Sequence, residues 1–206
     1  MSSDSEIKII LLGEAGVGKT NLISVATGGT FSYGTMSSSS GSYQEGTYIA
    51  SNNKKYDYHL WDTAGQEAYR SLNKIFIQNS KVIICVYAID NEHSFKELDF
   101  WIDLVRGELG EKGYVLGIAA NKNDLYEDQV VKDEDGKNYA KSKGYKFKAT
   151  SALSDPTGFK SFLEELLVDY IKTIDPTCKD DVNKNAFTLQ PGSGSKKTEN
   201  NKKKCC

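Results

Sequence analysis

Short apolar runs rich in β-branched residues recur along the chain, and segments of helical period follow most of them. The runs 7–12, 81–89 and 114–120 are apolar almost throughout, which is typical of strands buried on both faces of a parallel sheet, and 145–149 can supply one more. The segments 48–50 and 55–61 are typical of a strand pair that turns at 51–53. The pattern predicts an α/β fold that is doubly wound: a mostly parallel six-stranded sheet with one antiparallel edge strand and helices on both faces.

Three helical segments stand out. The first covers about 19–26, directly after the run 7–12 and a glycine-rich turn. Between 93 and 109, and again between 159 and 170, apolar residues recur at the spacing that places them on one face of a helix. The sequence Ser154-Asp155-Pro156 is a start signal for the last of these helices.

Two segments do not follow the pattern. The stretch 28–46 is rich in glycine and serine and has no period, and the chain from about 175 onward is polar. We expect both segments to be mobile. The expected organisation is a short N-terminal extension at 1–6, one domain over 7–174, and a flexible tail over 175–206 that ends in two cysteines.

The composition indicates one soluble domain and argues against binding to nucleic acid. The 206 residues are 38% hydrophobic and 26% charged, and the net charge is -2, whereas a nucleic-acid-binding chain is typically basic. No apolar run approaches the roughly 20 residues of a membrane-spanning helix, and residues 1–6 are polar where a signal peptide is basic and then apolar. We therefore expect a cytoplasmic protein, and the four cysteines do not suggest a disulfide framework.

A phosphate-binding loop is the strongest chemical signal. Residues 13–20 read Gly-Glu-Ala-Gly-Val-Gly-Lys-Thr and match G-x-x-x-x-G-K-[ST], between a predicted buried strand and a predicted helix. Glycines at these places let backbone N–H groups close on phosphate oxygens at a helix N-terminus. Lys19 would supply positive charge and Thr20 a hydroxyl for magnesium, although the same residues could also form a plain turn.

Three further polar segments follow predicted strands. Asp62, at the end of one strand, could hold a water on magnesium, and Gly65 could offer its N–H to a terminal phosphate. The alternative is an acidic cap for the next helix. Residues 121–124, Asn-Lys-Asn-Asp, place the carboxylate of Asp124 where it could accept hydrogen bonds from the ring N–H and the amine of guanine, which adenine does not offer. Residues 150–152, Thr-Ser-Ala, follow the next strand.

Together these segments resemble the Ras superfamily of P-loop small GTPases. The phosphate loop, Trp-Asp-Thr-Ala-Gly-Gln-Glu at 61–67, and the segments 121–124 and 150–152 occur in the family's order over about 6–174, and 61–67 with the terminal Cys-Cys looks most like the Rab branch. The resemblance implies binding of GTP and GDP with Mg²⁺. It also implies two catalytic residues: Lys19 on the β- and γ-phosphates, and Gln66, which orients the attacking water.

The resemblance also assigns the binding residues one by one. Phe31 would stack edgewise on the base, the backbone N–H of Ala152 would meet the guanine oxygen, and Thr20 and Asp62 would hold magnesium. The nucleotide-binding residues expected on this basis are Ala15, Gly16, Val17, Gly18, Lys19, Thr20, Asn21, Phe31, Gly65, Asn121, Lys122, Asp124, Ser151, Ala152 and Leu153.

The chain departs from the family pattern in its first switch region. Relatives use a threonine there on magnesium and the γ-phosphate, but the expected position falls in a run of four serines, so Ser39 is the candidate metal ligand and Thr35 a weaker one. Ala68, Ala88 and the pair 75–76 replace other residues that the family commonly carries. We expect these changes to alter which partners bind, and to leave GTP binding intact with a less tightly ordered active state.

The tail resembles the hypervariable, prenylated tail of Rab proteins. Lysines at 196–197 and 202–204 precede Cys205 and Cys206, which would accept geranylgeranyl groups. The expected partners are a guanine nucleotide, the prenylation machinery, a membrane bound through the lipidated tail, and an exchange factor, a GTPase-activating protein and effectors bound through the switch regions. The alternative is an unmodified, solvated terminus.

Three functions remain open from the sequence. The first is a slow, Mg²⁺-dependent GTPase that regulates vesicle traffic while reversibly attached to the cytosolic face of an intracellular membrane. The second is a nucleotide-dependent interaction module with little or no hydrolysis, which the missing switch threonine suggests. The third is an ATP-using P-loop enzyme, which Asp124 disfavours.

Overall fold

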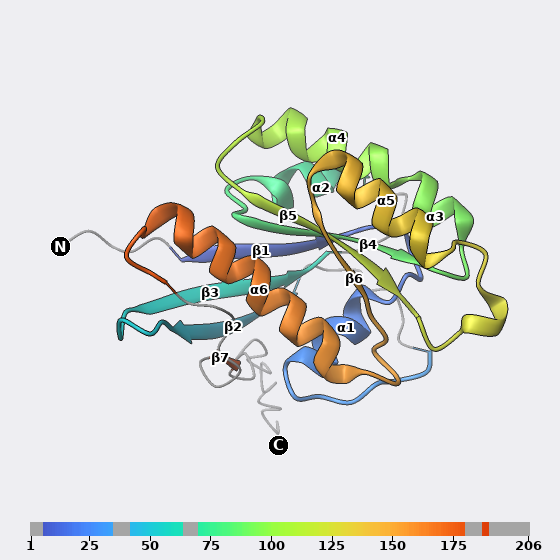
Figure 1. Ribbon diagram of the computed structural model, residues 1–206, viewed down its shortest axis with the longest axis horizontal. Helices are drawn as coiled ribbons and strands as arrows, with labels where there is room; N and C mark the ends of the chain where they lie inside the picture. Colours follow the sequence, from blue (N-terminus) through green and yellow to red (C-terminus); the bar gives the residue numbers. More distant parts are fainter. Residues whose placement is uncertain (1–5, 35–41, 64–69, 180–186, 190–206) are drawn as a thin grey trace, which may run out of the picture.

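A twisted sheet lies between two layers of helices in the computed structural model, which describes residues 6–34, 42–63, 70–179 and 187–189 (Figure 1). Within these ranges the sheet has seven strands in the order β6-β5-β4-β1-β3-β2-β7. The first five in this order run parallel to one another, β2 is antiparallel to β3, and β7 is antiparallel to β2. The strands are β1 (Ile7–Leu12), β2 (Ser42–Ile49), β3 (Lys55–Asp62), β4 (Val82–Ala88), β5 (Val115–Asn121), β6 (Lys146–Ala149) and β7 (Phe187–Leu189).

Each face of the sheet has its own apolar cluster and its own helices. α1 (Lys19–Ala26) and α6 (Pro156–Ile174) cover one face, where Ile9, Leu60 and Phe162 are buried. α2 (Arg70–Ile77), α3 (Glu92–Lys96), α4 (Leu98–Leu109) and α5 (Asp133–Lys143) cover the other (Figure 1). β4 is fully buried because it lies between both layers. The predicted doubly wound α/β fold is confirmed.

Local signals account for the helix boundaries that matter most. α1 begins directly after Gly18, whose backbone is left-handed. α6 begins as predicted, because the carboxylate of Asp155 accepts a hydrogen bond from the N–H of Gly158 at 2.9 Å and Pro156 occupies the first turn. The segment 93–109 is two helices, since Asn91 caps the short helix α3 and α4 starts anew at Leu98. No helix in the described part of the chain is both long and apolar enough to cross a membrane.

Two segments without a predicted pattern contain strands. β2 begins at Ser42, so residues 42–46 of the stretch 28–46 are strand, because all eight residues of β2 pair with β3 in continuous register from Ser42–Asp62 to Ile49–Lys55. Within 175–206, Asp175 and Thr177 contact Lys54 and Asn52 of the β2–β3 turn, and 187–189 form β7. In the described part of the chain, the sheet therefore has one strand more than the predicted six.

The topology brings the predicted site segments to one edge of the sheet. Gly13 follows β1, Asp62 ends β3, Asn121 ends β5 and Thr150 follows β6, so all four lie at the carboxyl ends of parallel strands. Ligands of open α/β sheets bind at this edge.

Candidate nucleotide site

The loop after β1 contains two glycines, Gly13 and Gly18, at positions where any other residue would strain the backbone. Gly13 has a φ of 145°, and a Cβ there would lie 2.1 Å from the carbonyl oxygen of Val86. Gly18 has a φ of 94°, and a Cβ there would lie 2.5 Å from Nδ2 of Asn121. The loop ends at the N-terminus of α1, whose first turn carries no acidic side chain. This is the arrangement that binds phosphate groups through backbone N–H groups.

Lys19 lies inside this loop. Its side chain is 5% exposed, and Nζ donates hydrogen bonds to the carbonyl oxygens of Gly13 at 2.7 Å and Glu14 at 2.9 Å. Burial lowers the pKa of Lys19 to about 8, while the carboxylates of Asp62 and Glu14 oppose that shift. The loop therefore holds a positive charge at the place where a phosphate would enter.

Asp62 is the last residue of β3, and its carboxylate interacts with the ammonium of Lys19. It is 4% exposed, and its neighbour Thr63 donates a hydrogen bond from its hydroxyl to the carbonyl oxygen of Leu11 in β1. Mg²⁺ prefers hard oxygen ligands and binds in nucleotide sites through one or two protein ligands plus phosphate oxygens. The hydroxyl of Thr20 and the carboxylate of Asp62 fit that ligand set. Thr63 was not among the residues predicted from the sequence, although it lies within the motif 61–67.

A cavity of about 280 Å³ opens next to the phosphate loop. Nine of the predicted nucleotide-binding residues line it, together with Tyr33 and Leu125, which were not predicted from the sequence. Leu125 directly follows Asp124, and Tyr33 lies two residues after Phe31, so proximity to the motifs was the available signal. The lining residues are Gly16, Gly18, Asn21, Phe31, Tyr33, Asn121, Lys122, Asp124, Leu125, Ala152 and Leu153.

Asn121 connects the two ends of this cavity. Its Nδ2 donates to the carbonyl oxygen of Val17 in the phosphate loop at 2.7 Å, and its Oδ1 accepts from the hydroxyl of Thr150 after β6 at 3.3 Å. The side chain is 2% exposed. Lys122 follows with a left-handed backbone, at φ 65°, and its Nζ lies 3.0 Å from the carboxylate of Asp90. One buried amide thus fixes the spacing between the phosphate loop and the segment 121–124.

Asp124 is oriented by Ser151. The hydroxyl of Ser151 donates to the carboxylate of Asp124, and the same oxygen accepts from the N–H groups of Leu153 at 3.2 Å and Ser154 at 2.9 Å. An ionised carboxylate has about four acceptor positions, so Asp124 retains capacity for two further donors. It borders the cavity, and a base that presents two N–H groups side by side would match it.

Asn21 positions the aromatic wall of the cavity. Its side-chain amide donates to the carbonyl oxygen of Ser32 at 3.1 Å and accepts from the N–H of Ser32 at 3.2 Å. This places Phe31 against the cavity, with its ring edge-on to Tyr33 at 4.8 Å between centroids. Phe31 also packs partly against the apolar cluster under α1, so it is both a wall residue and a core residue.

The remaining predicted residues divide into two groups. Ala15, Val17, Lys19, Thr20 and Ser151 lie in or beside the loops of the site without lining the cavity, and the side chain of Val17 is fully buried. Gly65, Gln66, Ser39, Cys205 and Cys206 fall outside the described residues.

An aromatic surface lies on β2, β3 and α2. The ring of Trp61 is 4.8 Å from that of Tyr43 and 6.0 Å from that of Phe76, and the ammonium of Lys8 lies 5.1 Å from the centre of the Trp61 ring. Tyr43 is 43% exposed. Large aromatic side chains that are partly exposed are enriched in protein interfaces.

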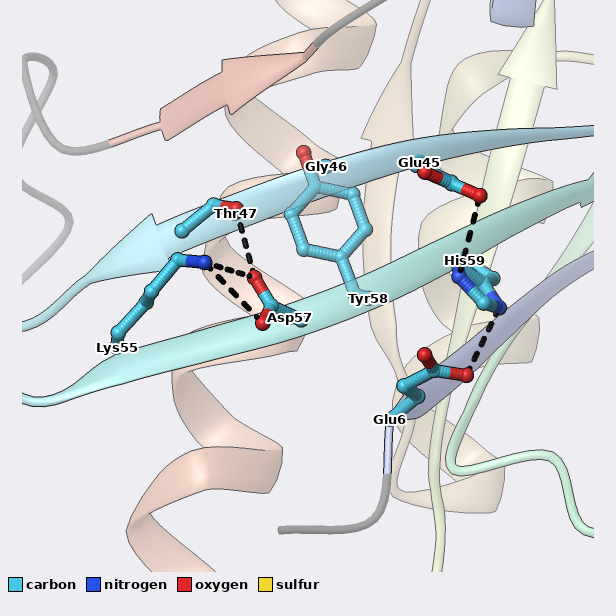
Figure 2. Close-up of a pocket in the computed structure, with 8 residues that line it drawn as sticks. All are labelled: Glu6, Glu45, Gly46, Thr47, Lys55, Asp57, Tyr58 and His59. Carbon is cyan, nitrogen blue, oxygen red and sulfur yellow. Dashed lines mark hydrogen bonds and ion pairs between the residues drawn. The ribbon is translucent and has the colours of Figure 1, made fainter. Parts of the chain in front are cut away.

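Beside this surface, a hollow of about 270 Å³ lies on the outer face of the β2–β3 hairpin (Figure 2). His59 projects between Glu6 at 3.4 Å and Glu45 at 4.0 Å, and Asp57 is paired with Lys55 at 3.0 Å. These contacts are exposed or half-exposed, and each acidic group named here has a basic neighbour. The hollow is a solvated, internally paired surface beside the aromatic side chains.

Comparison with known proteins gives the family. The model of the Ras family matches residues 8–172. The Ras-related protein Rab-26 of Mus musculus is 34% identical over 79% of this chain, and the match covers 64% of that protein. Rab-11B of Dictyostelium discoideum is 35% identical over 71% of the chain and 66% of its own length. RABA2b of Arabidopsis thaliana is 30% identical over 98% of the chain and 95% of its own length.

The match to the family model covers the cavity and the three motif segments that line or flank it. The phosphate loop at 13–20 and the segments 121–124 and 150–152 all fall within residues 8–172. Together with the doubly wound fold and the relatives named above, this match places the protein: the chain belongs to the Ras family and is a Rab-like member of it.

Proposed function

We propose that the protein binds GDP and GTP with Mg²⁺ and acts as a nucleotide-dependent switch. One observation carries this proposal: the carboxylate of Asp124, held by Ser151, borders the same cavity as Gly16 and Gly18 of the phosphate loop. The chain therefore presents a guanine-type acceptor at one end of a cavity and a phosphate cradle at the other. Membership of the Ras family supports the same assignment.

Each residue of the site would have its own role in nucleotide binding or hydrolysis. Backbone N–H groups of the phosphate loop and the ammonium of Lys19 would bind the phosphates, Asp124 and Asn121 would orient the base, and Phe31 would flank it. Thr20 and Asp62 would hold Mg²⁺, which neutralises phosphate charge when it is bound. In hydrolysis, Gln66 would orient a water whose oxygen attacks the γ-phosphorus. The bond to the β–γ bridging oxygen breaks, which gives GDP and phosphate.

We further propose that hydrolysis is slow and that the switch serves vesicle traffic. The relatives are Ras-related Rab proteins, and the partly exposed aromatic surface of Tyr43, Trp61 and Phe76 offers a docking area for exchange factors, activating proteins or effectors. Cys205 and Cys206 would carry lipid groups that attach the chain reversibly to the cytosolic face of an intracellular membrane. A prenyl donor should label the wild type and leave the Cys205→Ser, Cys206→Ser double variant unlabelled; equal labelling of both would remove these cysteines from the proposal.

A nucleotide-dependent interaction module without hydrolysis is the second candidate, because a serine run occupies the place of the usual switch threonine. Single-turnover hydrolysis of pre-bound GTP separates the two. We expect slow release of phosphate by the wild type and at least about tenfold slower release by Gln66→Leu, with unchanged GDP affinity. Equal rates for both proteins would show that Gln66 does not take part, and no release by the wild type would favour the module.

A further inference from the structure

The two edges of the central sheet differ in how they are protected. An exposed edge strand presents unpaired backbone N–H and C=O groups, and proteins protect such edges with short strands, lysines or prolines. β6 follows this rule, since it has four residues, Lys-Phe-Lys-Ala, and both lysines are exposed. Lys146 is further fixed by Glu165 at 2.6 Å and Asp169 at 2.7 Å.

β2, on the other side, lacks these devices. It has eight residues, Ser-Tyr-Gln-Glu-Gly-Thr-Tyr-Ile, with neither lysine nor proline. Tyr43 and Ile49 are 43% and 50% exposed. Its outer edge would therefore be a template for another strand unless something covers it.

The chain's own segment Phe187–Leu189 covers that edge. β7 pairs antiparallel with β2 in the register Gly46–Leu189, Thr47–Thr188 and Tyr48–Phe187, and it lies beside β2 below the sheet in Figure 1. We propose that the β2 edge is a strand-docking surface whose occupant is this tail segment, held in cis as a displaceable edge strand. A partner that adds an extended strand to β2 must first displace β7.

A second anchor keeps the tail segment close to its docking edge. The carboxylate of Asp175 accepts hydrogen bonds from Nζ of Lys54 and the hydroxyl of Tyr56, both at 2.7 Å, so the end of α6 is tied to the β2–β3 turn. Cys178 is 4% exposed and belongs to the apolar cluster on the face of the sheet that α1 and α6 cover. Seven residues separate Lys179 from Phe187, a span of at most about 28 Å when fully extended. The tail segment is thus present at high effective concentration beside β2.

The pairing is short enough to be reversible. β7 makes three register pairs with β2, whereas β3 makes eight. The hydrogen bonds of three residues gain little over the backbone entropy that their ordering costs, and closing the loop from the Asp175 anchor adds a small further cost. The same strand that protects the edge can therefore leave it when a competing strand arrives.

The β7–β2 pairing and the Asp175 anchor depend on different groups of the chain. The Asp175 anchor depends on side chains, while strand pairing depends on backbone N–H groups, which proline lacks. A proline triple variant, Phe187→Pro, Thr188→Pro, Leu189→Pro, therefore removes the pairing and keeps the Asp175 anchor. The matched control is Gly192→Pro, Ser193→Pro, Gly194→Pro, which adds the same number of prolines three residues beyond the strand with no change in charge.

Amide hydrogen exchange, resolved for residues 46–48 in the full chain, tests the proposal. We expect at least one of these amides to exchange five- to tenfold faster in the 187–189 variant and in a chain shortened after Lys179, and none to change in the 192–194 control. Amides of β6 and GDP affinity should be the same in all four proteins, which shows that the variants fold. Identical exchange at 46–48 in all four would overturn the proposal. So would an equal increase in the control.

Discussion

The nucleotide cavity and the β2–β3 hairpin belong to one sheet, but different forces hold them. At the cavity, hydrogen bonds join polar groups that are far apart in the sequence, as between Asn121 and Val17 and between Ser151 and Asp124. The hairpin instead has an exposed outer face of paired charges and aromatic rings, and Asp175 holds its turn from the end of α6. Buried hydrogen bonds therefore fix the cavity, whereas the outer face of the hairpin is held by contacts at the surface.

The largest effect on this contrast should come from Asn121→Ala. The change removes the link between the phosphate loop and the β5 and β6 loops and leaves the carbonyl oxygen of Val17 buried without that donor. A loss of about 2–3 kcal/mol is expected for such a group, so GDP should bind about hundredfold more weakly. Calorimetric titration of GDP checks this. Asn138→Ala on the exposed side of α5 is the control, and equal losses in both variants would refute the special role of Asn121.

The second prediction concerns the cavity alone: GDP affinity should depend on pH through the charge of Lys19. Burial lowers its pKa to about 8 in the phosphate-free protein, so the ammonium loses its proton above pH 8 and binding a phosphate must restore it. GDP affinity should therefore fall as pH rises, by about tenfold between pH 7 and 9. Dissociation constants at pH 7, 8 and 9 test this. Guanosine, which has no phosphate, should show no such trend; a parallel trend for guanosine would assign the effect to another group.

A smaller effect is expected from Ser151→Ala. The hydroxyl orients Asp124 and accepts two backbone N–H groups, so its loss should cost about 1 kcal/mol and weaken GDP binding about fivefold to tenfold. Binding of inorganic pyrophosphate should not change, because Ser151 is placed at the base end. Ser142→Ala, which removes a hydroxyl hydrogen bond on α5, is the control for GDP binding. If pyrophosphate binding weakens equally, Ser151 acts on the whole loop and not on Asp124.

The smallest effect on the site should come from the hairpin side, with Asp175→Asn. Hydrogen bonds from Lys54, Thr177 and Tyr56 hold the pKa of Asp175 well below its usual range. Its ionised form therefore stabilises the folded state at neutral pH, and this stabilisation is lost as pH falls below the ordinary aspartate value of about 3.9. The variant should have a lower Tm than the wild type at pH 7, with a gap that narrows below about pH 4, and unchanged GDP affinity. A gap that widens in acid would contradict this assignment.

Sequence patterns predicted the cavity better than the hairpin, for a physical reason. The phosphate loop and Asp124 have to follow buried strands directly, so a local motif and an apolar run suffice to place them. The start of β2 at Ser42 and the strand β7 were missed because short polar or glycine-containing segments show no period, and only pairing with β3 and β2 makes them strands. Tyr33 reaches the cavity because Asn21 binds Ser32, a contact that no motif encodes.

The base preference of the cavity tests the central claim most directly. Xanthine carries an oxygen where guanine carries the exocyclic amine, so an amide at position 124 can donate to xanthine but cannot accept both guanine donors. We expect wild type to prefer GDP over XDP and ADP, and Asp124→Asn to lose at least about hundredfold in GDP affinity while it gains affinity for XDP. The exposed neighbour variant Asp128→Asn should keep the wild-type preference. If Asp124→Asn binds GDP and XDP as wild type does, the cavity is not a guanine site of the kind proposed.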